Sequence, residues 1–179
     1  QRYLEELKKL VIHPEMIHEM GKELKIVYTP LHGTGNVLVR RVLSELGFEQ
    51  VYVVPEQELP DGNFSTVKSP NPEDPAAFAL ALKLAKEKGA ELVLATDPDA
   101  DRLGVYAKDS KTGEYHSFTG NMSGMLICEY MLSQKRELGK IAKDGTLVRT
   151  VVTTKMADKV AKEYELRLIE VLTGFKYIG

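Results

Sequence analysis

The sequence predicts an α/β protein in which strand–helix–strand units recur. Short apolar runs of the kind found in buried strands alternate with longer stretches of helical periodicity, and glycines and prolines separate them. Two such units stand out, in residues 25–54 and 147–171. Because parallel strands need a crossover connection, each unit predicts a parallel pair joined by a right-handed helical crossover.

The composition is that of an ordinary globular protein. The chain has 179 residues, 43% hydrophobic and 28% charged, which is enough for one domain or two small ones. A net charge of −2 gives no basic footprint for nucleic acid or an anionic membrane, so we expect neither as a partner. The single Cys128 excludes an internal disulfide, and there is neither a signal peptide nor a long apolar run, so we expect a cytoplasmic protein.

Residues 1–24 predict two short helices, the second beginning at Pro14, a residue suited to a first helical position. No initiator methionine precedes residue 1, and the chain stops directly after a strand and a loop motif. We therefore expect a piece of a longer protein, with residues 1–24 serving as linker helices from a first domain that is absent here.

A glycine-rich turn follows the first strand, residues 25–28, and precedes a helix over residues 37–46. A strand, a turn of this kind and a helix N-terminus together form a generic anion site. Neither a P-loop nor a G-x-G-x-x-G pattern is present, and such glycines serve equally well for tight strand–helix packing. We keep His32 and Gly33 only as neighbours of a site.

The middle of the chain predicts a long loop, a helix and three strands. Residues 55–75 carry five of the eight prolines, so we expect a loop that is functional, mobile or held by local hydrogen bonds. An Ala- and Leu-rich helix over residues 76–88 precedes the apolar run 92–95. The next strand, 103–107, follows too closely for a crossover helix, so it must run antiparallel or turn away. A further short strand is expected at 115–118.

Residues 120–179 predict a long helix, a polar break, and then the second strand–helix–strand unit. We expect the helix to begin at Asn121 or Ser123 and to lose its pattern from Lys135, with Cys128 packed in a core. The strands are expected at 147–152 and 167–171, with a helix over 156–164 between them.

The most informative stretch is the acidic loop Asp97-Pro98-Asp99-Ala100-Asp101-Arg102, directly after the strand at 92–95. Three neighbouring carboxylates repel one another, which raises the pKa of one or more of them unless a cation lies between them. Oxygen ligands alone suit a hard ion such as Mg²⁺, Mn²⁺ or Ca²⁺. Arg102 adds a fixed cation that can hold a phosphate by two hydrogen bonds. The loop therefore predicts a metal and phosphate site, the alternative being an acidic surface loop.

Other classes of protein also use closely spaced aspartates. An EF-hand is excluded because Arg102 stands where the sharp turn needs glycine and Lys108 where the loop needs glutamate. A haloacid-dehalogenase-type phosphatase needs a small residue after its second loop aspartate, and Asp101-Arg102 does not supply one. A metal-binding or partner-binding α/β module without catalytic activity stays open.

The acidic loop and its context resemble the α-D-phosphohexomutase superfamily, which includes phosphoglucomutase and phosphomannomutase. Residues 29–36, Thr-Pro-Leu-His-Gly-Thr-Gly-Asn, look like the opening turn of that family's second domain. Residues 173–176, Thr-Gly-Phe-Lys, look like the stretch of the third domain that approaches the sugar. The resemblance runs from about residue 25 to the end, and it is nearest to the branch that includes phosphopentomutases and sugar-bisphosphate synthases.

The resemblance implies a fold and a set of site residues. Residues 25–119 would form a three-layer α/β/α sandwich on a small mixed sheet, the metal-binding domain II, and residues 120–179 part of a similar domain III. Asp97, Asp99 and Asp101 would bind Mg²⁺, and Arg102 would stabilise the moving phosphoryl group. Thr173 and Gly174 would lie near the sugar.

The resemblance also implies a reaction, the interconversion of hexose 1-phosphate and hexose 6-phosphate. An active-site phosphoserine would pass its phosphoryl group to the sugar phosphate through a bisphosphate intermediate. The family's serine motif, T-A-S-H-N-P, is absent from this sequence. We therefore expect an active longer protein, an inactive chain of residues 1–179, and the remaining domains as partners of this one.

Overall fold

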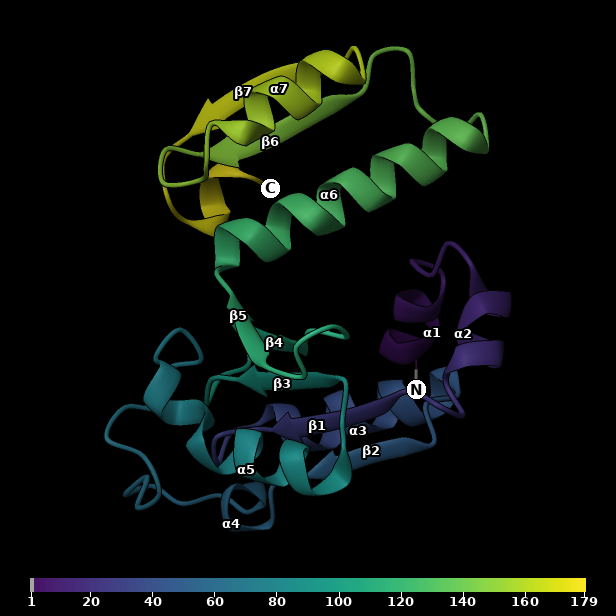
Figure 1. Ribbon diagram of the computed structural model, residues 1–179. Helices are drawn as coiled ribbons and strands as arrows, with labels where there is room; N and C mark the ends of the chain where they lie inside the picture. The colour runs from purple at the N-terminus through teal and green to yellow at the C-terminus, as the bar shows by residue number, and fades with distance from the viewer. Residues whose placement is uncertain (1) are drawn as a thin grey trace. The chain divides into compact units, whose positions relative to one another are not determined.

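The computed structural model describes residues 2–179, which divide into two compact units. The first unit ends at Gly120, and the second runs from Asn121 to Gly179. Each unit combines helices with a β-sheet (Figure 1), so the predicted α/β class is confirmed.

A mixed five-stranded sheet lies at the centre of the first unit, in the order β2-β1-β3-β4-β5. The strands are β1 (Lys25–Thr29), β2 (Gln50–Val53), β3 (Leu92–Thr96), β4 (Leu103–Lys108) and β5 (Tyr115–Phe118). β1 pairs in parallel with both β2 and β3, while β4 and β5 add on as antiparallel strands. Of the two options left open by the sequence for the strand after the acidic loop, antiparallel or turned away, the structure shows the antiparallel one.

Helices cover the sheet on both sides. α3 (Gly35–Leu46) joins β1 to β2, and α5 (Ala79–Lys88), which follows the short 3-10 helix η1 (Pro75–Phe78), leads into β3. Because β2 and β3 lie on opposite sides of β1, right-handed crossovers place α3 and α5 on opposite faces (Figure 1). The result is a three-layer α/β/α arrangement.

The two helices expected as a linker, α1 (Arg2–Lys8) and α2 (Pro14–Met20), both contact α3. The second helix ends at Met20 instead of residue 24. Gly21 is buried there against Gly47, whose carbonyl oxygen would lie 2.5 Å from a Cβ at position 21. A residue with a side chain would not fit at this contact, so the glycine allows α2 to meet the end of α3.

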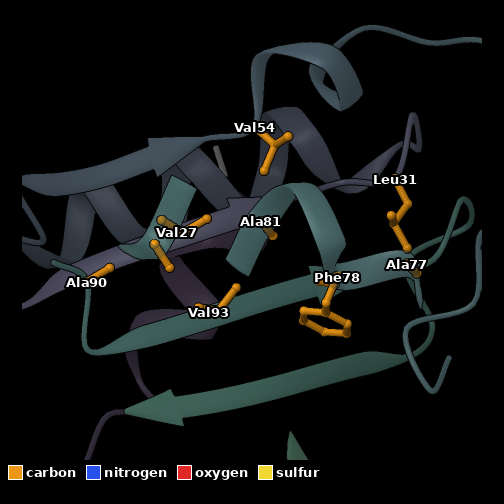
Figure 2. Packing of buried hydrophobic residues seen from close by; sticks show 10 residues of the cluster. Val27, Leu31, Val54, Ala77, Phe78, Ala81, Ala90 and Val93 are labelled. Carbon is orange, nitrogen blue, oxygen red and sulfur yellow. The ribbon is translucent and has the colours of Figure 1, made fainter. Parts of the chain in front are cut away.

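The hydrophobic core of the first unit lies between the sheet and α5. Val27 of β1, Val93 of β3 and Ala81 of α5 are fully buried and face one another in this layer (Figure 2). Phe78 and Leu31 extend the cluster towards the end of the sheet at which the acidic loop begins. This core fixes the strand ends from which the candidate site is built.

The long loop expected at residues 55–75 is not wholly irregular. It opens with a one-turn helix, α4 (Pro55–Glu58), whose first residue is proline, a known signal for a helix start. Gln57 of this turn is fully buried, with its side chain hydrogen-bonded to Thr29 and Thr66. The remaining loop residues are held by turns such as the one around Asp61.

The second unit contains the long helix α6 (Gly120–Glu137) and the parallel pair β6 (Thr146–Thr150) and β7 (Arg167–Val171), linked by α7 (Met156–Glu163). The helix continues past Lys135, since Lys135 and Arg136 suit the negative end of a helix dipole. The first strand ends at Thr150, because Val151 and Val152 turn outward and are exposed.

Cys128 is only half-buried, so its expected place in a core is wrong. The reason is that α6 has no fully buried residue along its length. Among residues 2–179, no helix is both long and apolar enough to cross a membrane.

Candidate metal-binding site

The acidic loop begins where β3 ends and curls back on itself within one turn. The amide of Ala100 donates to the carbonyl oxygen of Asp97 at 3.0 Å, and Ala100 has a left-handed φ of 59°. This turn gathers the carboxylates of Asp97, Asp99 and Asp101, each of which offers an oxygen within 4.8 Å of the others. The predicted cluster is therefore formed by the backbone of the loop itself.

Asp97 is fully buried, and Arg102 compensates its negative charge through an ion pair. The amide of Arg102 donates to Oδ1 at 2.9 Å, and Nε of the same residue donates to Oδ2 at 2.7 Å. Burial alone would raise the pKa of Asp97, but these hydrogen bonds and the guanidinium charge outweigh it and hold the pKa below its usual value. Asp97 is therefore an ionised anchor at the base of the loop.

The other two carboxylates face solvent. The negative charge of Asp99, followed by the contact with Asp97, raises the pKa of Asp101 above its ordinary value. Arg102 does not compensate this charge fully, because its Nε lies 3.7 Å from Asp101 but is hydrogen-bonded to Asp97. An all-oxygen donor set with uncompensated negative charge fits a hard divalent cation such as Mg²⁺.

The glycine-rich turn after β1 supports the loop from one side. Both the amide and the hydroxyl of Thr34 donate to the carbonyl oxygen of Pro98, at 2.9 and 3.1 Å. A Cβ at Gly33 would lie 2.5 Å from Cα of Pro98, and one at Gly35 would lie 2.7 Å from Oγ1 of Thr96. The glycines in this turn allow the two loops to touch backbone to backbone.

Asn71 is a site residue that the sequence did not indicate, apart from a general capacity for local hydrogen bonds. Its Oδ1 accepts from Nη1 of Arg102 at 3.1 Å, although 31 positions separate the two residues. Gly104 of β4 leaves space for the segment that carries Asn71, since a Cβ there would lie 2.3 Å from the carbonyl oxygen of Pro72. No local pattern in the sequence connects Asn71 with the acidic loop.

The other predicted site residues are His32, Thr173, Gly174 and Arg102. His32 is buried, but its ring contacts Leu59 and Thr66 and not the carboxylates. Thr173 and Gly174 belong to the second unit, directly after β7, where Gly174 has a φ of 133°. Arg102 is half-exposed beside the aspartates, in a position to meet an anion from solvent.

Comparison with known proteins places this geometry in a family. Residues 1–112 match the family model described as phosphoglucomutase/phosphomannomutase, alpha/beta/alpha domain II, and residues 119–179 match the model of domain III. A probable phosphomannomutase of Haemophilus influenzae is 42% identical over 161 residues, which cover 90% of this chain and 32% of that protein. A phosphoglucomutase of Staphylococcus aureus is 39% identical over 157 residues, 88% of this chain and 28% of that protein.

The fold of this chain is also similar to that of a solved structure. The structure of a phosphomannomutase described as putative, from Thermus thermophilus, aligns with a TM-score of 0.69 at 22% identity, over 98% of this chain and 36% of that one. The chain thus spans about a third of the length of the relatives that it matches. Since the two family models together cover nearly all of its residues, the chain belongs to the phosphoglucomutase/phosphomannomutase family.

Proposed function

We propose that this chain supplies the metal-binding domain, and part of the following domain, of a phosphosugar mutase that interconverts hexose 1-phosphate and hexose 6-phosphate. The observation that carries the proposal is the cluster of three carboxylates at the end of β3, with Arg102 beside it. The names of the relatives, phosphomannomutase and phosphoglucomutase, support the reaction class. A phosphopentomutase or a sugar-bisphosphate synthase of the same superfamily is the alternative.

The residues of the loop have different parts in this proposal. Asp97, Asp99 and Asp101 would hold Mg²⁺, with Asp97 fixed by Arg102 and the two exposed carboxylates free to adjust to the ion. When bound, the cation would neutralise charge on the phosphoryl group during transfer. Arg102 would orient that group through its half-exposed guanidinium. Thr173 and Gly174 would contact the sugar.

The phosphoserine of the proposed mechanism would come from another part of a longer protein, because the T-A-S-H-N-P motif is absent from this sequence. The bisphosphate intermediate would likewise be held between this chain and the remaining domains. We therefore propose that residues 1–179 alone bind the metal but do not catalyse the reaction, and that the active protein works in the cytoplasm.

Metal binding by the chain is the first test. The affinity for Mn²⁺, used as a paramagnetic probe for Mg²⁺, is measured for the wild type, for Asp99→Asn and for Glu87→Gln. The last variant removes an equal charge from the exposed face of α5. Losing a residue that only hydrogen-bonds to a metal ligand lowers metal affinity by about 10- to 100-fold. Because Asp99 is a proposed ligand itself, we expect Asp99→Asn to lower the Mn²⁺ affinity by more than this, and Glu87→Gln to leave it unchanged.

Activity is then measured in the longer protein that contains this chain. Glucose, mannose and ribose 1-phosphates are each supplied with Mg²⁺ and a trace of sugar bisphosphate. Turnover of one of them that is lost in Asp99→Asn supports the mutase and names its sugar. Metal binding without turnover of any sugar phosphate would reject the mutase and favour a non-catalytic metal-binding module.

A further inference from the structure

His32 is a buried histidine with a hydrogen bond at each ring nitrogen. Nδ1 lies 2.8 Å from the carbonyl oxygen of Leu59, and Nε2 lies 2.8 Å from Oγ1 of Thr66. A carbonyl oxygen can only accept, so Nδ1 carries the proton and donates it. The Thr66 hydroxyl already accepts from Nε2 of Gln57 at 3.2 Å, so its own hydrogen is available for Nε2 of His32.

The histidine is one link of a buried chain of hydrogen bonds. The side-chain Oε1 of Gln57 in α4 accepts from the Thr29 hydroxyl at 2.7 Å. The backbone carbonyl oxygen of Gln57 accepts from the backbone amide of His32 at 3.0 Å. The amide of Leu31 in turn donates to Oγ1 of Thr29 at 3.1 Å. His32 therefore ties the end of β1 to α4 and to the loop around Thr66. Phe64 lies edge-on to this ring, with its ring centroid 6.2 Å from that of His32.

These bonds hold an unfavourable backbone conformation. Leu31 and His32 have left-handed φ values of 46° and 64° in succession, a conformation that residues with side chains rarely adopt. The Leu31 side chain is fixed in the hydrophobic core and the His32 ring in the polar chain. Without one of these two anchors, the turn would relax towards ordinary φ values.

The same turn carries the contacts that support the acidic loop. Gly33, next to His32, packs directly on Pro98, and Thr34 makes two hydrogen bonds to the carbonyl oxygen of Pro98. Pro98 lies between Asp97 and Asp99. A change in the turn at residues 31–32 would therefore move the backbone on which the carboxylates stand.

We propose that His32 is a positioning residue: it locks the left-handed turn and thereby holds the acidic loop in its metal-binding shape. His32 touches neither the metal nor the substrate in this proposal, and it acts through Gly33 and Thr34. The inference rests on the proposed metal role of the loop. The proposal explains why a histidine stands at position 32. Its ring supplies both a donor for the carbonyl oxygen of Leu59 and an acceptor for the hydroxyl of Thr66.

The test measures amide hydrogen exchange at Thr34 and Arg102, whose N–H groups bond to Pro98 and to Asp97. The variants are His32→Ala, which removes both ring contacts, and Thr66→Val, which removes one and leaves the histidine in place. The control is Tyr115→Phe, which loses the 2.6 Å hydrogen bond to Ala90 at the opposite end of β3. Losing one buried hydrogen bond is enough to shift a local opening equilibrium by about tenfold.

We expect exchange at Thr34 and Arg102 to be faster by about tenfold or more in His32→Ala and Thr66→Val, and unchanged in Tyr115→Phe. His32→Asn should restore most of the protection, because asparagine tolerates a left-handed φ and its amide can donate to Leu59. Unchanged exchange in His32→Ala and Thr66→Val, or an equal increase in Tyr115→Phe, would overturn the proposal. If His32→Ala does not fold, the exchange rates of Thr66→Val test the proposal.

Mn²⁺ affinity is measured on the same variants and should fall in the order wild type, His32→Asn, His32→Ala. This second measurement separates the two proposals. A wild-type chain that binds no Mn²⁺ contradicts the proposed function, whereas the exchange rates still decide whether His32 holds the loop. Equal Mn²⁺ affinity of wild type and His32→Ala, with both folded, counts against the positioning role.

Discussion

At the scale of single residues, Gly33 allows the two loops of the site to approach each other closely. A Cβ at this position would lie 2.5 Å from Cα of Pro98 and 2.7 Å from its carbonyl oxygen. Neither atom belongs to a flexible side chain, so the clash can be relieved only by moving the backbone of the acidic loop. The need for glycine here comes from close packing between loops.

Gly33→Ala should therefore lower the free energy of unfolding by about 1–3 kcal/mol and weaken Mn²⁺ binding at the same time. Gly62→Ala is the matched control, because no atom lies within 4 Å of a Cβ built there, and its effect should stay within about 0.5 kcal/mol. Denaturant unfolding and Mn²⁺ titration measure both quantities. A Gly33→Ala chain as stable as Gly62→Ala would show that the loops can separate freely.

At the scale of elements, the loop after α4 is held by its own hydrogen bonds. Asp61 accepts from the Ser65 hydroxyl at 2.6 Å and from the amides of Ser65 and Asn63 at 2.9 Å. These bonds, the Ser65 hydroxyl first, lower the pKa of Asp61 from 3.8 to about 2. A loop rich in proline thus gains a rigid turn beside the residues that contact His32.

The pH dependence of this turn has a definite sign. Because the folded pKa of Asp61 is below its ordinary value, the turn is stabilised above pH 3.8, and this contribution is lost as the pH falls towards about 2. Ser65→Ala should raise the pKa of Asp61 towards 3.8, while Ser69→Ala in the same loop should not. The carboxyl ¹³C shift of Asp61, followed by NMR through acid titration, measures this, and a pKa still about 2 in Ser65→Ala would contradict the assigned cause.

At the scale of the whole molecule, the two units differ in how much core they contain. The main hydrophobic cluster and the five-stranded sheet lie within the first unit. The second unit has a two-stranded sheet, and its buried apolar side chains are Ala157, Val160, Ala161 and Tyr164 among the described residues. A sheet of two strands with so small a core gives little independent stability.

A shortened chain of residues 1–120 should therefore fold by itself. Its free energy of unfolding should lie within about 1 kcal/mol of the corresponding transition in the whole chain, and its Mn²⁺ affinity should be unchanged. Residues 121–179 alone should unfold at a much lower denaturant concentration, or without a cooperative transition. Loss of folding in the 1–120 chain would mean that the second unit is required for the stability of the first.

The sequence by itself determined the α/β class and the parallel pairs, and it excluded a helical crossover after the acidic loop. It also singled out Asp97, Asp99, Asp101 and Arg102, because strand periodicity, crossover length and carboxylate spacing are local properties of the chain. The one-turn helix α4 was missed although Pro55 signalled it, since a single turn leaves no periodic pattern.

Tertiary structure decided which distant residues complete the site. Asn71 reaches Arg102 across 31 positions, and His32 reaches Thr66 across 34. The polarity of a side chain shows that it needs a hydrogen-bond partner, but the partner is chosen only when packing brings two segments together. For the same reason the sequence predicted His32 only as a neighbour of a site, and the structure was needed to show that its ring bonds to Leu59 and Thr66.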